Sequence, residues 1–312
     1  MQDSWKYRYG LIFWCILWVS KLKAWLKFIS ESDKANTDRR FEEAHDYPMD
    51  WQNPRTLNQK IQWLKLYDRK EEYKIYGDKW AVRDWVKSEV GEEYLIPVHL
   101  VTDKPSDVNP DNLPNTPFIV KANHDSGSFQ IVRDKSKIDW QTMRRRCEKW
   151  LSRNYYWADR EWQYDGIPRK ILIEKLLLTE SGHIPNDYKF NVFGGKVEFI
   201  YVSVDREGSN KRNIYDAFWK PLNFTWAAKK KDHTTMRGDE IDPPSNLTKM
   251  IQIAEHLGSF FPYVRVDLYE VDGKIFFGEI TQHQGGGYDR MLPHEWDIKW
   301  GELIKLPKED IY

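Results

Sequence analysis

The sequence predicts an α+β protein in which antiparallel hairpins lie between capped helices. Two stretches carry this prediction, residues 187–205 (DYKFNVFGGKVEFIYVSVD) and residues 263–281 (YVRVDLYEVDGKIFFGEIT). In both, apolar and polar residues alternate along each arm, which is the period of half-buried strands. A glycine-containing turn separates the arms, as in a hairpin. With 312 residues, the chain can form one large domain or two to three lobes.

The composition gives no reason to expect a nucleic-acid partner. Lysine plus arginine and aspartate plus glutamate both number 48, so no net charge favours a polyanion. The two cysteines, Cys15 and Cys147, lie in unrelated contexts, which favours a reducing compartment over a disulfide framework. We therefore expect a cytoplasmic protein that binds no nucleic acid.

An N-terminal unit of residues 1–35 is predicted to contain an amphipathic helix over residues 11–29. Its apolar run is too short to span a bilayer, and lysines follow it where a signal peptide would have a cleavage site. Wound as a helix, the segment places Ser20, Lys23 and Lys27 opposite an apolar stripe of Leu11, Trp14, Trp18, Leu22, Trp25 and Ile29. This pattern is typical of a helix on an anionic membrane surface, here the inner face of the cell membrane. A helix docked on its own domain or on a partner is the alternative.

Residues 36–115 are expected to form a region that precedes the main fold. Residues 30–50 are charged and poor in aliphatic side chains, and are predicted to be a linker. Thr56 is predicted to cap one helix, and Asp78 to cap another that ends at Gly91. Basic residues recur at helical spacing in the second helix, where a solvated face is expected: Lys79, Arg83 and Lys87.

Residues 117–134 (PFIVKANHDSGSFQIVRD) place Lys121 at the end of a predicted strand, just before a polar loop. A lysine beside a loop with free backbone N–H groups, such as the one around Ser126 and Gly127, suits a polyphosphate. The spacing of a Walker A motif is absent, and an ordinary hairpin is the alternative.

Residues 171–178 (ILIEKLLL) predict an apolar strand that Glu174 and Lys175 interrupt. An acidic residue in such a strand is costly unless it is paired or faces a ligand. Helices are predicted from Asp139 to about Ser152, and from about residue 246 to 257.

The hairpin at residues 263–281 is a candidate metal site. A three-residue loop, Val271 to Gly273, would place Arg265, Asp267 and Glu279 on one face and gather apolar residues on the other. A two-residue turn would shift the register by one and send Asp267 and Glu279 to opposite faces. We therefore predict the longer loop. Two carboxylates and an arginine can hold a divalent cation against phosphate oxygens, and an ordinary ion pair is the alternative.

Six stretches, taken in order, make the chain resemble the TupA-like (teichuronopeptide biosynthesis) branch of the ATP-grasp superfamily. They are LNQKIQWLKLYD, DKWAVRDWV, FIVKANHDSG, ILIEKLL, DYKFNVFGGKVEFI and VRVDLYEVDGKIFFGEIT. The resemblance covers most of residues 51–307. It implies an ATP-grasp fold in which two α+β lobes with antiparallel sheets, here residues 116–178 and residues 179–312, clasp ATP. The N-terminal helix lies outside it.

The resemblance implies nucleotide-binding roles for residues of the first lobe. Lys121 corresponds to the lysine that touches the α- and β-phosphates of ATP. Ser126 and Gly127 correspond to the flexible phosphate flap. Glu174 and Leu177 correspond to the segment that lines the adenine pocket.

In the second lobe, the resemblance implies phosphate, metal and catalytic roles. Lys189 corresponds to the second phosphate-facing lysine, and Arg265 to the arginine beside the transferred phosphate. Asp267 and Glu279 correspond to the carboxylates that bind Mg²⁺. Thr281 stands where many ATP-grasp enzymes have an asparagine. The Gln282–Gly287 segment that follows also departs from the family pattern, at the acceptor end of the site.

The activity that the resemblance implies is that of an ATP- and Mg²⁺-dependent carboxylate–amine ligase acting through an acyl phosphate. Its family context indicates that an amino acid or other amine is joined to a sugar carboxylate or glycan in surface-polysaccharide or capsule biosynthesis. The alternatives are a kinase or a glycosyltransferase acting on a polysaccharide precursor, and a non-catalytic scaffold.

Overall fold

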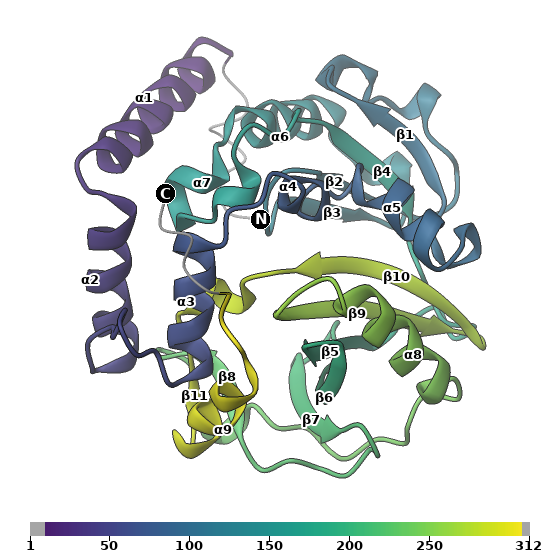
Figure 1. Cartoon of the computed structure of the whole chain (residues 1–312). Coiled ribbons are helices and arrows are strands. Elements are labelled where there is room, and N and C mark those ends of the chain that lie inside the picture. The colour runs from purple at the N-terminus through teal and green to yellow at the C-terminus, as the bar shows by residue number, and fades with distance from the viewer. Residues whose placement is uncertain (1–9, 308–312) are drawn as a thin grey trace.

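The computed structural model describes residues 10–307, and two larger antiparallel sheets face each other within it (Figure 1). The first sheet, in spatial order, consists of β1 (Val98–Thr102), β4 (Ile171–Lys175), β2 (Phe118–Ala122) and β3 (Phe129–Val132). The second consists of β10 (Lys274–Thr281), β9 (Tyr263–Val271), β5 (Asp187–Phe193), β6 (Lys196–Val204) and β7 (Lys211–Asp216). A small sheet pairs β11 (Asp289–Leu292) with β8 (Thr225–Ala228). The predicted α+β class is confirmed.

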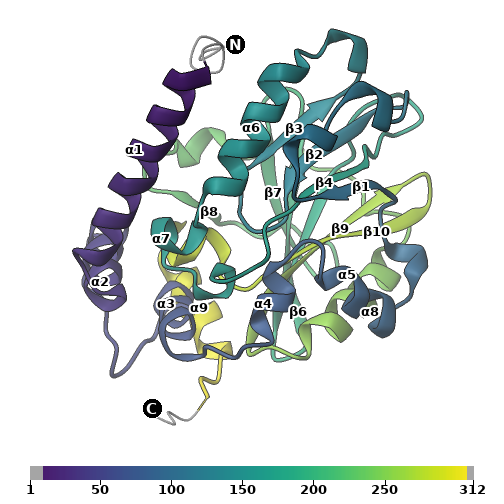
Figure 2. The ribbon, with the colours of Figure 1, turned by 90° about the horizontal axis from the view of Figure 1, so that it is seen from above.

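The helices surround the two larger sheets, and the first three of them lie along one side of the molecule (Figures 1 and 2). They are α1 (Gly10–Ile29), α2 (Asp33–His45), α3 (Leu57–Tyr67), α4 (Tyr73–Gly77), α5 (Val82–Glu89), α6 (Trp140–Ser152), α7 (Tyr155–Asp159), α8 (Leu247–Gly258) and α9 (Glu295–Leu303). We call the first sheet with α6 lobe one, and the second sheet with α8 lobe two, because α6 packs on β2 and α8 on β5, β6 and β9.

Helix α3 begins where the sequence predicts. The Thr56 hydroxyl accepts a hydrogen bond from the Gln59 N–H, and the Gln59 side chain accepts one from the Thr56 N–H, which forms a capping box. The second predicted cap is displaced, since α5 begins at Val82. Asp78 lies four residues earlier and accepts hydrogen bonds from the Trp80 N–H and the Asn123 amide.

Residues 33–45 form α2, so the predicted linker over residues 30–50 is wrong. Ser32 caps α2 by accepting a hydrogen bond of 3.2 Å from the Ala35 N–H. Phe41 is fully buried, and its ring lies 4.3 Å from that of His45. This helix is held by a few specific contacts and not by an aliphatic stripe, which explains why its charged composition indicated a linker.

Lobe one begins earlier in the chain than the predicted boundary at residue 116. Val98 to Thr102 form β1, which pairs with β4 over Ile171 to Glu174 and so extends the first sheet. The predicted N-terminal region of residues 36–115 therefore contributes one strand to lobe one. Its helices α2 and α3 pack instead against β11 and α9, beside lobe two.

The hairpin at residues 263–281 turns through two residues, Asp272 and Gly273, so the predicted three-residue loop is wrong. Val271 pairs directly with Lys274. The φ angles of Asp272 and Gly273 are 51° and 74°, and two positive φ angles in succession define the type I′ turn that matches the twist of antiparallel strands.

A two-residue turn alone would send Asp267 and Glu279 to opposite faces of the sheet. This does not happen, because β10 contains a β-bulge. Phe277 pairs with Leu268, and the register then shifts, so that Gly278 is the extra residue and Glu279 stands opposite Asp267. Residues directly opposite each other in an antiparallel pair point to the same face of the sheet. Asp267 and Glu279 therefore share a face, whereas an unbroken ladder would have turned Glu279 toward the core.

Candidate active site

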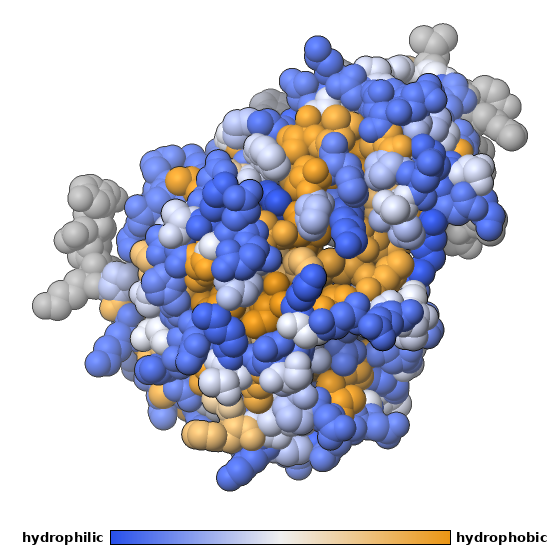
Figure 3. All heavy atoms as spheres, turned by 90° about the vertical axis from the view of Figure 1, so that its right-hand side faces the viewer, coloured by the Kyte–Doolittle hydropathy of each residue, from blue (hydrophilic) through white to orange (hydrophobic). Residues whose placement is uncertain are grey.

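A cleft of about 590 Å³ lies between the two lobes, which is within the usual range for a small-molecule site. Apolar surface gathers in the furrow on the face shown in Figure 3. Apolar residues of both lobes contribute to the lining of the cleft, among them Ile96, Ile119, Ile131, Leu176 and Ile184. It is also lined by these residues predicted from the sequence: Lys121, Ser126, Gly127, Glu174, Leu177, Lys189, Asp267 and Glu279.

Lys121 and Glu174 lie on the cleft face of lobe one, on the neighbouring strands β2 and β4. Glu174 is buried, and its Oε2 lies 2.6 Å from the Lys121 ammonium. The guanidinium of Arg83 lies 3.6 Å from the other carboxylate oxygen and also donates to the Ile96 carbonyl. The acidic residue in this apolar strand is therefore paired, and the pair holds the lysine at the cleft.

Lys79 is a cleft residue that the sequence analysis missed. Its ammonium donates to the carbonyl oxygen of Asp125, beside the predicted phosphate flap. The sequence predicts that Lys79, Arg83 and Lys87 form one row on a helix, but α5 begins only at Val82, so Lys79 lies before it. Lys87 is exposed, as predicted, and pairs with Glu92. Burial lowers the pKa of Lys79, which is typical of an ammonium enclosed at a site.

The loop after β2 has an exposed tip and buried anchors. Ser126 and Gly127 are exposed, while Asp125 and Ser128 on either side of them are buried. The Asp125 carboxylate accepts hydrogen bonds from the Ser128 hydroxyl and from Arg153, the latter at 3.2 Å. The loop is therefore fixed at its base, and its tip faces the cleft.

Charged residues of lobe two converge at the inner face of β5, β9 and β10. Lys189 stands opposite Asp267 across the strand pair, and its ammonium lies 2.9 Å from Oδ2 of that carboxylate. Arg265 donates to both oxygens of Asp267, at 2.6 and 2.8 Å, and to Oε1 of Glu279 at 2.6 Å. Arg265 thus contacts both carboxylates, as the hairpin prediction requires, but it does not itself line the cleft.

Neighbouring charges decide the ionisation of Glu279 and Lys189 in this cluster. Removal from bulk solvent acts to raise the pKa of Glu279, but Arg265, Lys79 and Lys189 together lower it to about 2. Desolvation likewise acts to lower the pKa of Lys189, and the carboxylates of Asp187 and Asp267 raise it above its usual value. Glu279 and Lys189 are therefore both charged at neutral pH.

Asp267 and Glu279 fit a Mg²⁺ ion that takes its other ligands from water and phosphate. Within residues 10–307, no group of three or more His, Cys, Asp or Glu side chains is placed to hold a metal. Two adjacent carboxylates nevertheless suffice for Mg²⁺ bound together with a nucleotide. The Thr281 hydroxyl donates to Oε1 of Glu279 at 3.0 Å and so helps to orient this carboxylate.

The Gln282–Gly287 segment continues from β10 and turns sharply through three glycines with φ between 57° and 75°. The Gln284 side chain accepts a hydrogen bond from Arg265, which links the segment to the carboxylate cluster. The carbonyl of Gly286 accepts hydrogen bonds of 2.9 Å from both Gln62 and Lys65 of α3.

The sequence analysis also missed Lys65. The only sign in the sequence that Lys65 is buried is its position four residues after Ile61, on the apolar side of α3. Its side chain is buried, with 2 % of the residue exposed. Besides the Gly286 carbonyl, its ammonium contacts the Tyr288 hydroxyl at 3.3 Å and lies 4.4 Å from the centre of that ring. Helix α3 therefore supports the Gln282–Gly287 segment from outside the two lobes.

His45 of α2 also supports the Gln282–Gly287 segment, and its burial leads us to expect that the stability of the protein depends on pH. Its Nε2 donates to the Gly287 carbonyl at 3.1 Å, and burial lowers the pKa of His45 from 6.5 to about 4. Between pH 6.5 and about pH 4, His45 is therefore protonated in the unfolded chain and neutral in the folded protein. The unfolding free energy decreases for this reason as the pH falls below about 6.5. On lowering the pH from 7 to 5, the wild type should lose about 2 kcal/mol more unfolding free energy than His45→Gln.

Urea denaturation at the two pH values measures this difference, with the exposed His99→Gln as the matched control. Equal losses in wild type and His45→Gln would contradict a neutral, buried His45.

Two facing antiparallel sheets, with a lysine from each lobe directed into a cleft beside paired carboxylates, define an ATP-grasp protein. The chain belongs to the TupA-like ATP-grasp family, whose model matches residues 59–305. The family assignment based on the six stretches is thereby confirmed.

Solved structures with similarity to the chain include several ligases. D-alanine–D-alanine ligase from Bacillus anthracis, complexed with ATP, is 17% identical with a TM-score of 0.37, covering 67% of this chain and 54% of that one. The enzyme from Helicobacter pylori is 15% identical with a TM-score of 0.42, covering 80% and 69%. L-amino acid ligase from Bacillus licheniformis is 14% identical with a TM-score of 0.42, covering 74% and 49%.

This chain thus spans about half the length of the Bacillus anthracis ligase. No match was found among curated proteins. Identities this low do not transfer the activity of those ligases to this chain.

Proposed function

We propose that this protein is an ATP- and Mg²⁺-dependent carboxylate–amine ligase that acts through an acyl phosphate. One observation carries the proposal: Lys121 of lobe one and Lys189 of lobe two enter one cleft, where Asp267 and Glu279 stand side by side. Positive groups from both lobes around a carboxylate pair are what a nucleotide triphosphate with its metal requires.

Lobe one would hold the nucleotide. Lys121 touches the α- and β-phosphates, and the exposed tip at Ser126 and Gly127 closes over them with its backbone N–H groups. Glu174 and Leu177 line the adenine end, where the apolar residues of the cleft exclude water. Asp267 and Glu279 would hold Mg²⁺, which would offset the negative charge of the phosphates.

In the reaction, an oxygen of the acyl donor carboxylate attacks the γ-phosphorus, and ADP leaves. The amine nitrogen then attacks the acyl carbon, phosphate departs with that oxygen, and the nitrogen loses a proton. Lys189 and Arg265 stabilise the negative charge on the transferred phosphoryl group. These steps need no covalent nucleophile from the protein.

The proposed acyl donor is a sugar carboxylate, such as a uronic acid within a polysaccharide precursor, and the amine is that of an amino acid. Arg206 and Arg212 line the lobe-two side of the cleft and supply positive charge for such a carboxylate. A precursor carried on a lipid would place the cytoplasmic enzyme at the inner surface of the cell membrane.

Incubation of the protein with Mg-ATP, uronic acids and amino acids tests the proposal. The expected result is equal amounts of ADP and phosphate together with a product of amide mass, and ¹⁸O from a labelled carboxylate appears in the phosphate. A phosphorylated sugar formed without an amine would contradict the proposal and identify a kinase. Turnover that depends on a sugar nucleotide without ATP would identify a glycosyltransferase.

Replacing Lys79 by methionine is expected to weaken Mg-ATP binding by about tenfold or more, because a charged hydrogen-bonding group is lost from the cleft. Isothermal titration calorimetry measures the dissociation constant. Lys87→Met, which removes an exposed lysine eight residues further along the chain, is the matched control and should bind as the wild type does. Equal affinity in both variants would remove Lys79 from the nucleotide site.

A further inference from the structure

Helix α1 turns an apolar face toward solvent along most of its length, as the sequence analysis anticipates. Trp18, for example, is 66% exposed. The exposed large apolar residues of the helix are Ile12, Trp14, Ile16, Trp18, Val19, Leu22, Trp25, Leu26 and Ile29. Proteins that remain free in solution rarely expose so continuous a patch. Residues 1–9, and the side chain of Leu11, lie outside the described part of the chain.

The apolar face is wider than the predicted stripe and has lysines on both borders. At 100° per residue, the exposed apolar side chains cover an arc of about 200°. Lys21 stands at one edge of this arc, and Lys23 and Lys27 stand at the other. Helix α1 contains no acidic residue. Its narrower remaining face packs on the protein, where Phe13 is buried and Phe28 lies against α7.

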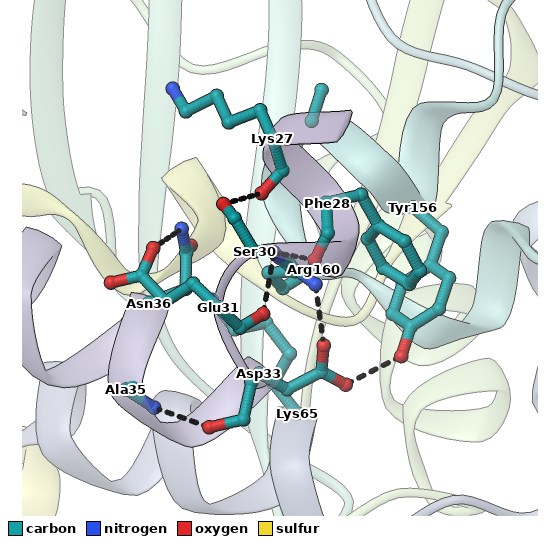
Figure 4. Close-up of polar contacts among 12 residues, drawn as sticks. Lys27, Phe28, Ser30, Glu31, Asp33, Ala35, Asn36, Lys65, Tyr156 and Arg160 are labelled. Carbon is teal, nitrogen blue, oxygen red and sulfur yellow. Dashed lines mark hydrogen bonds and ion pairs between the residues drawn. The ribbon is translucent and has the colours of Figure 1, made fainter. Parts of the chain in front are cut away.

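The C-terminal end of α1 is held by residues in and just after α7 (Figure 4). Arg160, which is 3% exposed, donates to the carbonyls of Phe28 and Glu31 at 2.9 and 3.1 Å. The same guanidinium donates to Asp33 at 3.0 Å, and the Tyr156 hydroxyl donates to the other oxygen of Asp33. An arginine that satisfies the last carbonyls of a helix both caps it and complements its dipole. The orientation of α1 is therefore fixed.

Helix α1 also lies on the side of the molecule that carries the Gln282–Gly287 segment. It packs on α6 and α7, and together with α2 and α3 it occupies the side toward which β10 ends (Figures 1 and 2). The Gln282–Gly287 segment follows β10 and contacts α3. A surface that binds α1 is therefore on the same side of the molecule as this segment, which the resemblance assigns to the acceptor end of the site.

We propose that the outward face of α1 docks on the surface of a bilayer that contains anionic lipid. Tryptophans with an apolar arc suit the interface between headgroups and acyl chains, and the bordering lysines suit negative headgroups. None of the helices in residues 10–307 is long and apolar enough to cross a membrane, so α1 lies in the surface. A second copy of this chain is a poorer occupant, because a two-fold contact between two α1 faces would bring lysine borders of like charge together.

Vesicle co-sedimentation of the full chain tests this proposal. The wild type is expected to bind vesicles of phosphatidylcholine with phosphatidylglycerol, less so at high salt, and to bind pure phosphatidylcholine much more weakly. The double variant Trp18→Glu/Leu22→Glu should lose binding by at least tenfold, because two charges enter the apolar arc. Phe218→Glu, at an 84% exposed aromatic residue of lobe two, is the matched control and should bind as the wild type does.

Wild-type binding that ignores phosphatidylglycerol, or a double variant that still binds, would overturn the proposal. A dimer in sedimentation velocity that Trp18→Glu/Leu22→Glu abolishes would assign the face to a contact between copies instead. Mg-ATP affinity is measured on each variant and should be unchanged, since α1 does not line the cleft. The docking surface and the proposed ligase activity can therefore fail independently.

Discussion

Replacing Asp267 by asparagine is expected to lower the rate of ADP formation by at least about 100-fold. The change removes one of the two adjacent carboxylates proposed to hold Mg²⁺, and it also removes a charge that Arg265 and Lys189 contact directly. A coupled assay for ADP measures the effect over a range of Mg²⁺ concentrations. Glu279→Gln should behave in the same way.

Asp272→Asn is the matched control, because it makes the same substitution at the turn of the same hairpin. Asp272 is exposed with φ of 51°, a conformation that asparagine tolerates, so this variant should retain wild-type turnover. Thermal melting separates loss of chemistry from loss of fold, since Asp267 is buried among basic groups. Wild-type turnover in Asp267→Asn would refute the metal assignment.

Replacing Gly301 by alanine is expected to destabilise the fold by about 3 kcal/mol. Gly301 is in α9, and a β-carbon there would lie 2.1 Å from the Arg55 carbonyl oxygen and 2.6 Å from the carbonyl carbon of Thr56. These atoms belong to the cap of α3, so the clash can be relieved only by separating two backbones. Urea denaturation measures the loss.

Gly10→Ala is the matched control, since it also adds a methyl group to a helical glycine. A β-carbon at Gly10 would meet its nearest neighbour, Arg145, at 3.7 Å, which is an ordinary contact. The unfolding free energy of Gly10→Ala should differ from that of the wild type by no more than about 1 kcal/mol. Equal stabilities of the two variants would show that α9 can move away from α3 at little cost.

Elements whose signal is local could be predicted from the sequence. The alternation in residues 187–205 and 263–281 gave their strands, and the Thr56 capping box gave the start of α3. The cleft residues Lys189 and Asp267 follow from the same strands, because alternation decides which side chains share a face. The order of several such stretches predicts the family.

Features that depend on distant partners could not be predicted in this way. Lys79 and Lys65 look like surface lysines until Asp125 and Gly286 are placed against them. The β-bulge was hidden for a different reason. A glycine inside a strand fits either a bulge or a plain ladder. The predicted three-residue loop places the change of register at the turn, whereas in the structure it occurs at Gly278.

Helices α2 and α3 hold the Gln282–Gly287 segment by hydrogen bonds, whereas other parts of the chain line the cleft. No residue of α2 or α3 lines the cleft, yet His45, Gln62 and Lys65 hold the backbone of Gly286 and Gly287. Substitutions in these two helices are therefore expected to shift the backbone of the Gln282–Gly287 segment while the strands that line the cleft keep their sequence. This segment can change its position, in evolution or by engineering, without any replacement of Lys121, Lys189, Asp267 or Glu279.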